Sequence, residues 1–537
     1  MKKQLAAKVP PAHRVLVAIT AAVLVVALGG CMMVGPGYKR PTAEVNDSWL
    51  ESSPTISDEP AEVREWWTSF NDPVMIALVN KAYEQNLTLR AAGLRVIQAR
   101  AARGISVGEF FPQEQEINAD YSKNKISKND LNNPPFHQYK TAGVSFDAAW
   151  ELDLWGKFRR NINAADAALL GSIADYDDVL VSLVAEVGLV YVEIRTLERR
   201  IDLSKENVRI QQQSFEVAES RFRHGAVTKL DVTEALSTLA NTKAAVPDLE
   251  SSLRTAKLSL CVLLGQSVSE LEEELAGGSG IPLAPSEVTI GVPADLLRRR
   301  PDVRSAERAA ASQSEQIGIA VADLFPSVSV GGSFGYEASD AGNLSLGSNN
   351  LFDRDSFIWS IGPSLNWPIL NYGRIMNNTR VQDAAFQEAA VNYQNTVLKA
   401  AAEVESALYG FLKARENLVY LTESSESSRQ SLELAKIQYL EGQTDFLRVD
   451  IAAEALSQQQ DKQATAEGQV ATTLISAYKA LGGGWDLRRG REFVPQETVD
   501  EMTERTNWGD ILAPDYTNGT DLGFPRPDGN NQTQLAP

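Results

Sequence analysis

Residues 150–157 have the sequence Trp-Glu-Leu-Asp-Leu-Trp-Gly-Lys, and residues 367–374 have the related sequence Trp-Pro-Ile-Leu-Asn-Tyr-Gly-Arg. An offset of 217 in residue number relates the two segments, and the same offset carries Tyr176 onto Tyr393. Upstream the offset is 214, which places Phe111-Pro112 on Phe325-Pro326. A register that holds over about 140 residues indicates a duplicated unit, with the small change in offset absorbed in a loop. The chain is therefore predicted to contain two copies of one architecture.

Each copy contains two segments in which apolar and polar residues alternate. The alternation covers 117–122 and 142–152 in the first copy, and 328–336 and 359–367 in the second. A period of two gives each segment one apolar and one polar face, as in a β-strand. The linkers between them are rich in Asn, Asp, Ser and Gly, as exposed loops are. The sequence therefore predicts one β-hairpin in each copy.

These strands have the features of membrane-spanning strands. The longer ones contain about ten residues and carry aromatic residues near their ends, which is typical of transmembrane β-strands. Four strands cannot close a barrel in lipid, where open sheet edges are excluded. Several chains would therefore share one barrel, and three chains would supply twelve strands. The alternative is a pair of hairpins packed on a soluble core.

The remaining parts of each copy are predicted to be long helices. No proline occurs between residues 135 and 247 or between residues 368 and 495. The segment 156–225 alone would form a helix of roughly 100 Å. Each helical run breaks at a short turn that contains Gly225 or Gly442, and glycine suits the left-handed residue at a helix C-terminus. Each copy should therefore form a long helical hairpin with its tip far from the strands.

The N-terminus has the pattern of a cleaved leader. Four basic residues precede an apolar run, 15–28, that is shorter than the ~20 residues of a membrane helix. The run ends in Leu28-Gly29-Gly30-Cys31, which resembles a bacterial lipobox. We therefore expect Cys31 to be the lipidated first residue, with N-palmitoyl and S-diacylglycerol groups as the only added chemistry and no other cofactor. The alternative is an ordinary signal peptide with an incidental cysteine.

Composition argues against several functions. Removal of residues 1–30 takes away four basic and no acidic residues, so the charge of −19 becomes −23, and nucleic acid is an unfavourable partner. The three histidines form no His-Glu-x-x-His motif, and the chain contains no phosphate-binding loop. The sequence therefore predicts neither an enzyme nor a metal site.

Several motifs in a fixed order resemble the TolC-like outer-membrane factors, in particular the lipoprotein (NodT-type) branch of tripartite resistance-nodulation-division (RND) efflux systems. The motifs are Cys31-Met32-Met33-Val34-Gly35-Pro36-Gly37-Tyr38-Lys39-Arg40-Pro41, Trp66-Trp67 with Phe70 and Asp72-Pro73, Trp150–Gly156, Arg299-Arg300-Pro301-Asp302-Val303, and Ile317-Gly318-Ile319-Ala320 running to Phe325-Pro326. The resemblance covers roughly residues 31–485. It implies a mixed α+β membrane protein: a homotrimer whose four strands per chain form a shared 12-stranded β-barrel, continued by a long periplasmic α-helical barrel.

The resemblance also implies a function and partners. The protein would be the exit duct of an RND-type pump, lipid-anchored in the outer membrane of a Gram-negative bacterium and passively conducting exported small molecules from the periplasm to the exterior. Its partners would be a periplasmic adaptor protein, an inner-membrane RND transporter and outer-membrane lipid. Two alternatives remain open: the conduit of a type I protein-secretion system, and a non-conducting, lipid-anchored periplasmic scaffold.

These patterns divide the chain into five parts. They are a lipoprotein signal peptide, 1–30; a lipidated extended segment, 31–65; a first repeat, 66–280, with its β-hairpin at 114–152 and its helical tip near 225; a second repeat, 281–485, with its β-hairpin at 327–369 and its tip near 442; and a C-terminal extension, 486–537, expected to be disordered from about residue 514.

In the family that the chain resembles, the helical tips close the periplasmic end of the duct. The usual pattern there has an aspartate nine residues after the glycine of the second tip, but in this chain that position is Ile451 and Asp450 comes one residue earlier. One residue is about 100° around a helix, so Asp450 would point elsewhere. Leu447 matches the family's apolar position, and Asp445 is a further acidic candidate. The gate candidates are thus Asp445, Leu447 and Asp450, and the alternative role for the two aspartates is helix capping.

Overall fold

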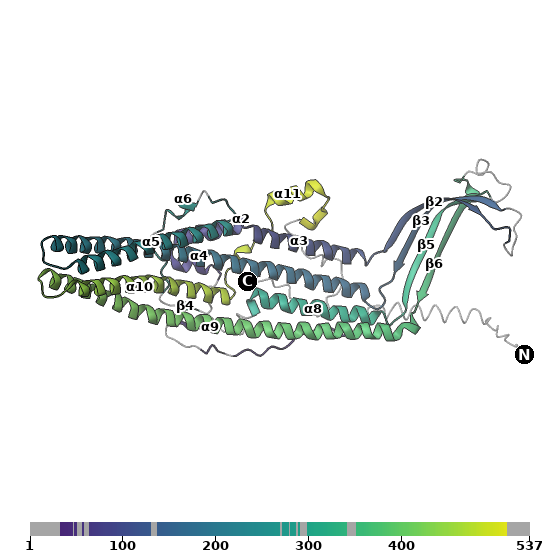
Figure 1. Cartoon of the computed structure of the whole chain (residues 1–537). Helices are drawn as coiled ribbons and strands as arrows, with labels where there is room; N and C mark the ends of the chain where they lie inside the picture. Colours follow the sequence, from purple (N-terminus) through teal and green to yellow (C-terminus); the bar gives the residue numbers. More distant parts are fainter. Residues whose placement is uncertain are drawn as a thin grey trace, which may run out of the picture.

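The structure is a computed structural model that describes residues 33–46, 48–50, 56–57, 64–129, 137–268, 271–278, 280–285, 288–289, 298–340 and 351–512. The predicted signal peptide, Cys31 and residues 513–537 lie outside these ranges. The molecule is elongated, with long helices over most of its length and a curved sheet at one end (Figure 1).

The sheet contains the four predicted strands. They are β2 (Glu114–Lys125), β3 (Gln138–Glu151), β5 (Ser327–Ser339) and β6 (Phe357–Asn366), all antiparallel in the order β2-β3-β5-β6. The hairpins of the two copies meet where β3 pairs with β5, and there the rings of Phe146 and Phe334 lie 5.2 Å apart. Strands β2 and β6 form the two edges. A second, parallel pair joins β1 (Ile56–Ser57) to β4 (Val288–Thr289).

The helices repeat with the offsets found in the sequence. They are α2 (Pro73–Gln85), α3 (Leu87–Gly108), α4 (Lys157–Arg223), α5 (Lys229–Leu263), α6 (Leu271–Leu275), α8 (Pro301–Ala322), α9 (Tyr372–Leu440), α10 (Phe446–Ala480) and α11 (Gln496–Arg505). The upstream offset carries both ends of α3 onto the ends of α8, and the downstream offset carries both ends of α5 onto the ends of α10. The predicted duplication is confirmed.

Five short 3-10 helices complete the described structure: η1 (Trp66–Phe70), η2 (Arg354–Ser356), η3 (Ile369–Asn371), η4 (Trp485–Arg488) and η5 (Gly509–Leu512). No helix among the described residues is both long enough and apolar enough to cross a membrane.

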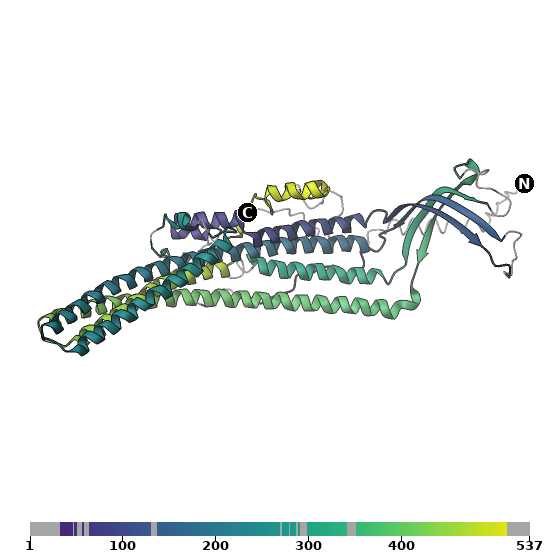
Figure 2. The ribbon, with the colours of Figure 1, turned by 45° about the horizontal axis from the view of Figure 1, so that its top comes forward.

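Near the sheet, four helices form a row in the order α3, α4, α8 and α9 (Figure 2). Helix α3 packs on α4, α4 on α8 and α8 on α9, so α3 and α9 lie at the two ends of the row. Farther from the sheet, α4 pairs with α5 and α9 with α10, and α10 also packs on α4. The far half of the molecule is therefore built from two helical hairpins side by side.

The main apolar core lies in the middle of the molecule, where η1 and α2 cover the helices. Trp66 and Trp67 are almost fully buried, and Trp66 stacks on Tyr478 of α10 with ring centroids 5.5 Å apart. Aromatic side chains of this size each bury a large apolar area, so the Trp-Trp motif links the N-terminal part of the chain to the end of the second repeat. Helix α11 packs on α3 in a smaller cluster with Ile97, Val494 and Met502.

Candidate functional site

The two helical hairpins end in turns of the same geometry. Gly225 and Gly442 have φ angles of +72° and +75°, so both are left-handed. In the first turn, the Ala226 amide donates to the carbonyl of Arg221 at 2.9 Å, and in the second the Gln443 amide donates to that of Gln438 at 2.8 Å. This is the pattern by which a left-handed glycine satisfies the last carbonyls of a helix.

Arg221 joins the two tips to each other. Its guanidinium donates to the carbonyls of Tyr439 and Leu440, each at 2.7 Å, and lies 4.4 Å from the centre of the Tyr439 ring. Tyr439 in turn packs edge-on against Phe446 of α10. Burial raises the pKa of Tyr439, so its phenol is neutral at physiological pH. A cation of the first repeat thus caps the C-terminus of α9 in the second repeat, where helix carbonyls and the helix dipole favour positive charge.

Two of the three gate candidates lie in one groove at the second tip. Asp445 and Leu447 line a groove of about 650 Å³ between α9 and α10, together with Arg448 and Ile451. Leu447 is 48% exposed and Ile451 is 59% exposed. Because they are four residues apart on a helix, they lie on the same face. The groove therefore presents an exposed apolar pair with an acid and a base beside it.

The third candidate, Asp450, is half-buried and does not line the groove. Asp445 occupies the N-cap position of α10 but makes no capping hydrogen bond with its side chain. At the first tip the equivalent position is Thr228, whose amide and hydroxyl both bond to the Asp231 carboxylate at 2.8 Å. Side chains thus cap the helix at the first tip, whereas the Asp445 carboxylate takes no part in capping at the second.

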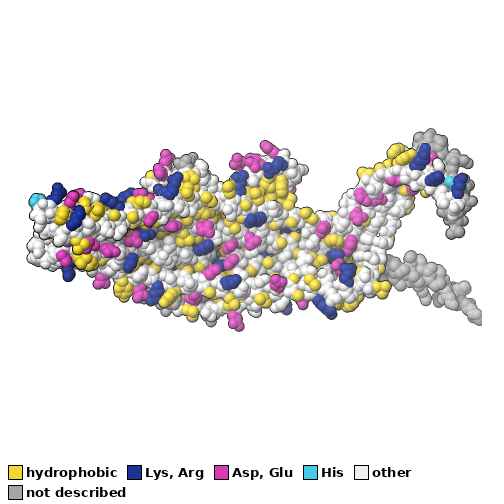
Figure 3. All heavy atoms as spheres, viewed as in Figure 1, with side chains coloured by type: hydrophobic (Ala, Val, Ile, Leu, Met, Phe, Trp, Pro, Cys, Tyr) yellow, Lys and Arg dark blue, Asp and Glu magenta, His cyan; other side chains and the backbone are white. Residues whose placement is uncertain are grey.

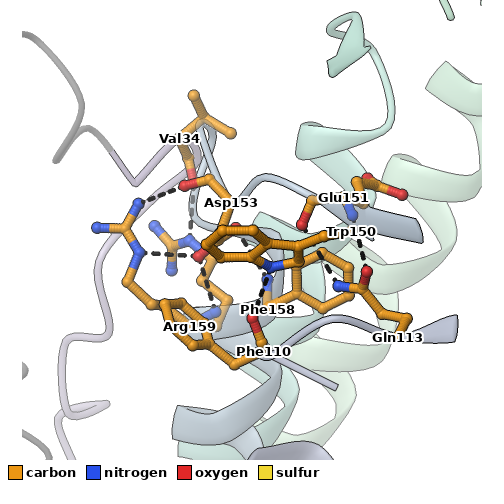
Figure 4. Close-up of polar contacts among 9 residues, drawn as sticks. Val34, Phe110, Gln113, Trp150, Glu151, Asp153, Phe158 and Arg159 are labelled. Atoms are coloured by element: carbon orange, nitrogen blue, oxygen red, sulfur yellow. Dashed lines mark hydrogen bonds and ion pairs between the residues drawn. The ribbon is translucent and has the colours of Figure 1, made fainter. Parts of the chain in front are cut away.

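At the other end of the helices, Asp153 fixes the junction between β3 and α4 (Figure 4). Its carboxylate accepts hydrogen bonds from the amides of Phe158 and Arg159 and forms an ion pair with the Arg159 side chain at 2.8 Å. Nearby, the Trp150 indole donates to the carbonyl of Phe110 at 3.1 Å. A carboxylate that accepts amides in the first helical turn stabilises the helix start, so the Trp150–Gly156 motif fixes the point at which α4 begins after β3.

The N-terminal strap, defined as residues 33–46 and 48–50, begins at this junction. The Val34 amide donates to the carbonyl of Trp155 at 3.0 Å. Arg160, whose side chain is almost fully buried, donates to the carbonyls of Val34 and Gly35 and pairs with Glu315 at 2.8 Å. One guanidinium therefore connects the strap, α4 and α8.

Farther along, the strap follows α8 and α9. Arg40 pairs with Glu307 at 2.7 Å, and the Tyr38 hydroxyl lies 3.5 Å from the Glu307 carbonyl. Burial, and then the charge of Glu307, raise the pKa of Tyr38 to about 12. Gln394 of α9 donates to the strap carbonyl of Thr42 at 2.9 Å. The Val34–Pro41 motif is thus a docking sequence for the first residues after the predicted lipidation site.

The sequence did not identify Arg160, Arg221 or Ile451 as residues of these sites. Ile451 could have been found from its four-residue spacing to Leu447. The partners of Arg160 and Arg221 are distant in the chain, and no local pattern predicts them. On the face of the molecule in Figure 3, acidic and basic side chains are interspersed over the helices, so no patch of a single sign marks a site there.

Comparison with known proteins gives matches over most of the chain. Residues 78–266 and 292–483, which cover most of the two repeats, match the family described as "Outer membrane efflux protein". Nodulation protein T of Rhizobium leguminosarum bv. trifolii is 31% identical over 86% of this chain and 96% of its own length. Outer membrane protein OprJ of Pseudomonas aeruginosa is 29% identical, covering 89% of this chain and 97% of that protein. Among solved structures, the outer-membrane channel OprN aligns with a TM-score of 0.77 and 33% identity, over 84% of this chain and 99% of that chain.

Proposed function

This chain belongs to the outer membrane efflux protein family, and we propose that three copies of it form the exit duct of a tripartite RND efflux pump. The protein is an outer-membrane efflux channel and not an enzyme. The observation that carries the proposal is a four-stranded sheet with two unpaired edges, placed at one end of helices that extend for roughly 100 Å.

The unpaired edges support a trimer. Strands β2 and β6 have a partner on one side only among the described residues. In lipid, the backbone groups of a sheet edge have no water to bond to, and closed barrels have at least eight strands. Joining β6 of one chain to β2 of the next removes every edge, and three copies give twelve strands. Strand β6 also exposes Trp359 and Ile361, at 68% and 72%, which suits contact with lipid.

The strap supports a lipid anchor on Cys31. Val34 is held at the junction of sheet and helices, and three residues of extended chain reach at most about 10 Å. A lipidated Cys31 would therefore enter the membrane at the foot of the sheet, with two or three acyl chains giving firm anchorage. Mass spectrometry of the membrane-extracted protein tests this: a mature N-terminus at Cys31 that carries acyl mass is expected, and an unmodified Cys31 rules it out.

The tips support a gate at the end distant from the membrane. Three copies of Leu447 and Ile451 around one axis would cover apolar side chains that a single chain leaves exposed, and Asp445 would add a ring of carboxylates. Helices of a periplasmic adaptor that bind the open arrangement more tightly than the closed one would then shift the tips toward opening. The inner-membrane transporter would deliver the exported small molecules to this entrance.

Single-channel conductance in planar bilayers, with the native mass recorded alongside, tests the proposed duct. The parent trimer should show a small conductance, and Leu447→Ala should increase it several-fold because it removes the apolar side chain from the tip. Asp445→Ala should act in the same direction, while Asp450→Ala, outside the groove, is the matched control. Stable trimers that insert but never conduct, in any of these variants, would instead support the scaffold.

A further inference from the structure

The duplicated copies are equivalent in three dimensions at the foot of the sheet. In the first copy, the Trp150 indole donates to the carbonyl of Phe110 at 3.1 Å. In the second copy, the Trp367 indole donates to the carbonyl of Leu324, also at 3.1 Å. The downstream offset relates the two donors and the upstream offset relates the two acceptors. A contact within one copy therefore predicts its counterpart in the other when these two offsets are applied.

A second set of contacts joins the first copy to the second. The Trp155 ring, just before α4, stacks on Phe325, just after α8, with centroids 4.6 Å apart and planes 25° apart. The Trp155 indole also donates to the carbonyl of Pro326 at 2.8 Å. Close by, Lys157 forms an ion pair with Asp323 at 2.8 Å. These contacts form the internal seam, where the start of α4 meets the end of α8.

The offsets give the counterparts of these residues. Trp155 becomes Tyr372 and Phe325 becomes Phe111, so an aromatic pair remains an aromatic pair. The counterpart of Lys157 is Arg374 and the counterpart of Asp323 is Glu109, so a basic and an acidic residue again occupy the two positions. The Tyr372 hydroxyl can replace the indole N–H as a donor. Four positions thus keep the chemistry that holds the internal seam together.

Within one chain these counterparts cannot meet. Tyr372 and Arg374 start α9, while Glu109 and Phe111 follow α3, and these two helices are at opposite ends of the row (Figure 2). Tyr372 is 57% exposed and Phe111 is 47% exposed. Arg374 makes no ion pair with any residue that the structure describes. Among the same residues, the Glu109 carboxylate accepts one hydrogen bond, from Asn161 at 2.8 Å. The contact surfaces are therefore present in one chain without their partners.

We infer that a second copy of this chain supplies the missing contacts, with Tyr372 of one subunit stacked on Phe111 of the next and Arg374 paired with Glu109. The inference rests on the trimer of the proposed function and assigns the residues that close it. The ring then has six similar seams, of which three lie within chains and three between them. The seam between subunits copies the internal one in chemistry and position.

Paired cysteines test this assignment. In a Cys261→Ser background, which removes the buried thiol, we would combine Phe111→Cys with Tyr372→Cys and treat the native trimer with a short bis-maleimide. Denaturing electrophoresis should then show covalent dimers and trimers. The matched control combines Trp155→Cys with Phe325→Cys at the internal seam, where the same reagent should link the chain to itself and leave its subunit mass monomeric.

The outcomes separate the assignment from the proposed function. Each single-cysteine variant should remain monomeric on the denaturing gel, because identical positions on neighbouring subunits do not meet. A trimeric native mass with no covalent oligomers from the paired variant overturns the residue assignment and leaves the duct intact. A monomeric native mass for the parent protein overturns both.

Charge reversal tests the ion pair separately. Arg374→Glu or Glu109→Arg alone places like charges at each of the three seams between subunits, so the fraction of trimer that survives mild SDS should fall. The double variant restores opposite charges and should recover most of the parent fraction. A double variant no more resistant than the two single variants overturns the pairing.

Discussion

The side chain of Arg160 contacts the strap and α8 at the same time, which makes it a central residue near the predicted lipid anchor. Its guanidinium bonds to Val34, Gly35 and Glu315, and the Arg160 and Glu315 side chains are only 4% and 8% exposed. Burial raises the pKa of Glu315 even with Arg160 beside it. The carboxylate therefore relies on this arginine for its charge partner.

Replacing Arg160 by Met should destabilise the protein strongly, since breaking a buried ion pair from one side typically costs about 3–5 kcal/mol. The double variant Arg160→Met with Glu315→Met should recover much of the loss, because no buried charge remains unpaired. Thermal unfolding in detergent measures both variants. Protease cleavage near residue 35 should increase in both the single and the double variant relative to the parent protein. A strap as well protected in these variants as in the parent would contradict the role of Arg160 in docking.

Gly156 and Gly373 occupy the same place in the duplicated motif but have different surroundings. Gly156 has a φ of +79°, and a Cβ there would lie 2.5 Å from the Met33 side chain of the strap. Gly373 lies within α9 with open space around it. Gly156→Ala should therefore cost more than about 1–2 kcal/mol, the usual cost of a left-handed residue with a side chain. Gly373→Ala should be neutral or stabilising, and equal losses in thermal stability would contradict this asymmetry.

The structural role of a residue could be predicted only where a local sequence pattern indicated it. The duplicated motif and the tip glycines are visible in the sequence, and the helix start at Asp445 follows from the residue types that favour an N-cap. The 100° step of a helix predicts that Asp450 points away from the direction of its neighbour Ile451, and in the structure Ile451 lines the groove whereas Asp450 does not. By contrast, whether a side chain such as Arg221 crosses from one hairpin to the other depends on how two helices pack, and nothing near it in the chain encodes that.

At the scale of elements, the two tips differ in how α5 and α10 begin. Thr228 and Asp231 cap α5 by mutual hydrogen bonds, whereas the Asp445 side chain makes no capping bond to α10. Thr228→Ala should therefore lower stability by about 1 kcal/mol, and Asp445→Ala by less. Hydrogen exchange at the two tips measures the local effect. If Asp445→Ala frayed α10 as strongly as Thr228→Ala frays α5, its effect on conductance could not be assigned to the duct.

Some elements extend beyond the local patterns that predict them, although β2 and β5 begin at 114 and 327, the first residues of the predicted hairpins. Strand β2 spans Glu114–Lys125, although regular alternation covers only 117–122, because ladder hydrogen bonds with β3 continue through polar residues. Helix α5 continues past Pro247 to Leu263, although the proline-free run of the sequence ends at that proline. A proline removes one backbone hydrogen bond, and packing of a long helix on α4 can offset that cost.

At the scale of the whole molecule, the strap is held by contacts within the protein, so we expect folding and assembly not to depend on the lipid. Val34, Arg40 and Trp49 hold the strap to the helices and the core along its length. Cys31→Ser should therefore lose the acyl mass but keep the trimeric native mass and the single-channel conductance of the parent. A monomeric Cys31→Ser protein would contradict this and make the acyl chains part of the assembly.

The overall architecture was predictable because the sequence contains two copies of it. A weak strand or turn pattern that recurs at a constant offset is stronger evidence than the same pattern found once. The order of the helices in the row was not predictable, because the sequence of one repeat does not show which face of its helices packs against the other repeat. That order appears only when α4 and α8 are seen packed together.

The bond from Arg221 to the end of α9 has a mechanical consequence. A guanidinium that holds the carbonyls of Tyr439 and Leu440 fastens the tip of one hairpin to the tip of the other within each chain. In a trimer, the two hairpin tips of each chain would then move together. The entrance would open by the motion of three paired units rather than of six independent hairpins.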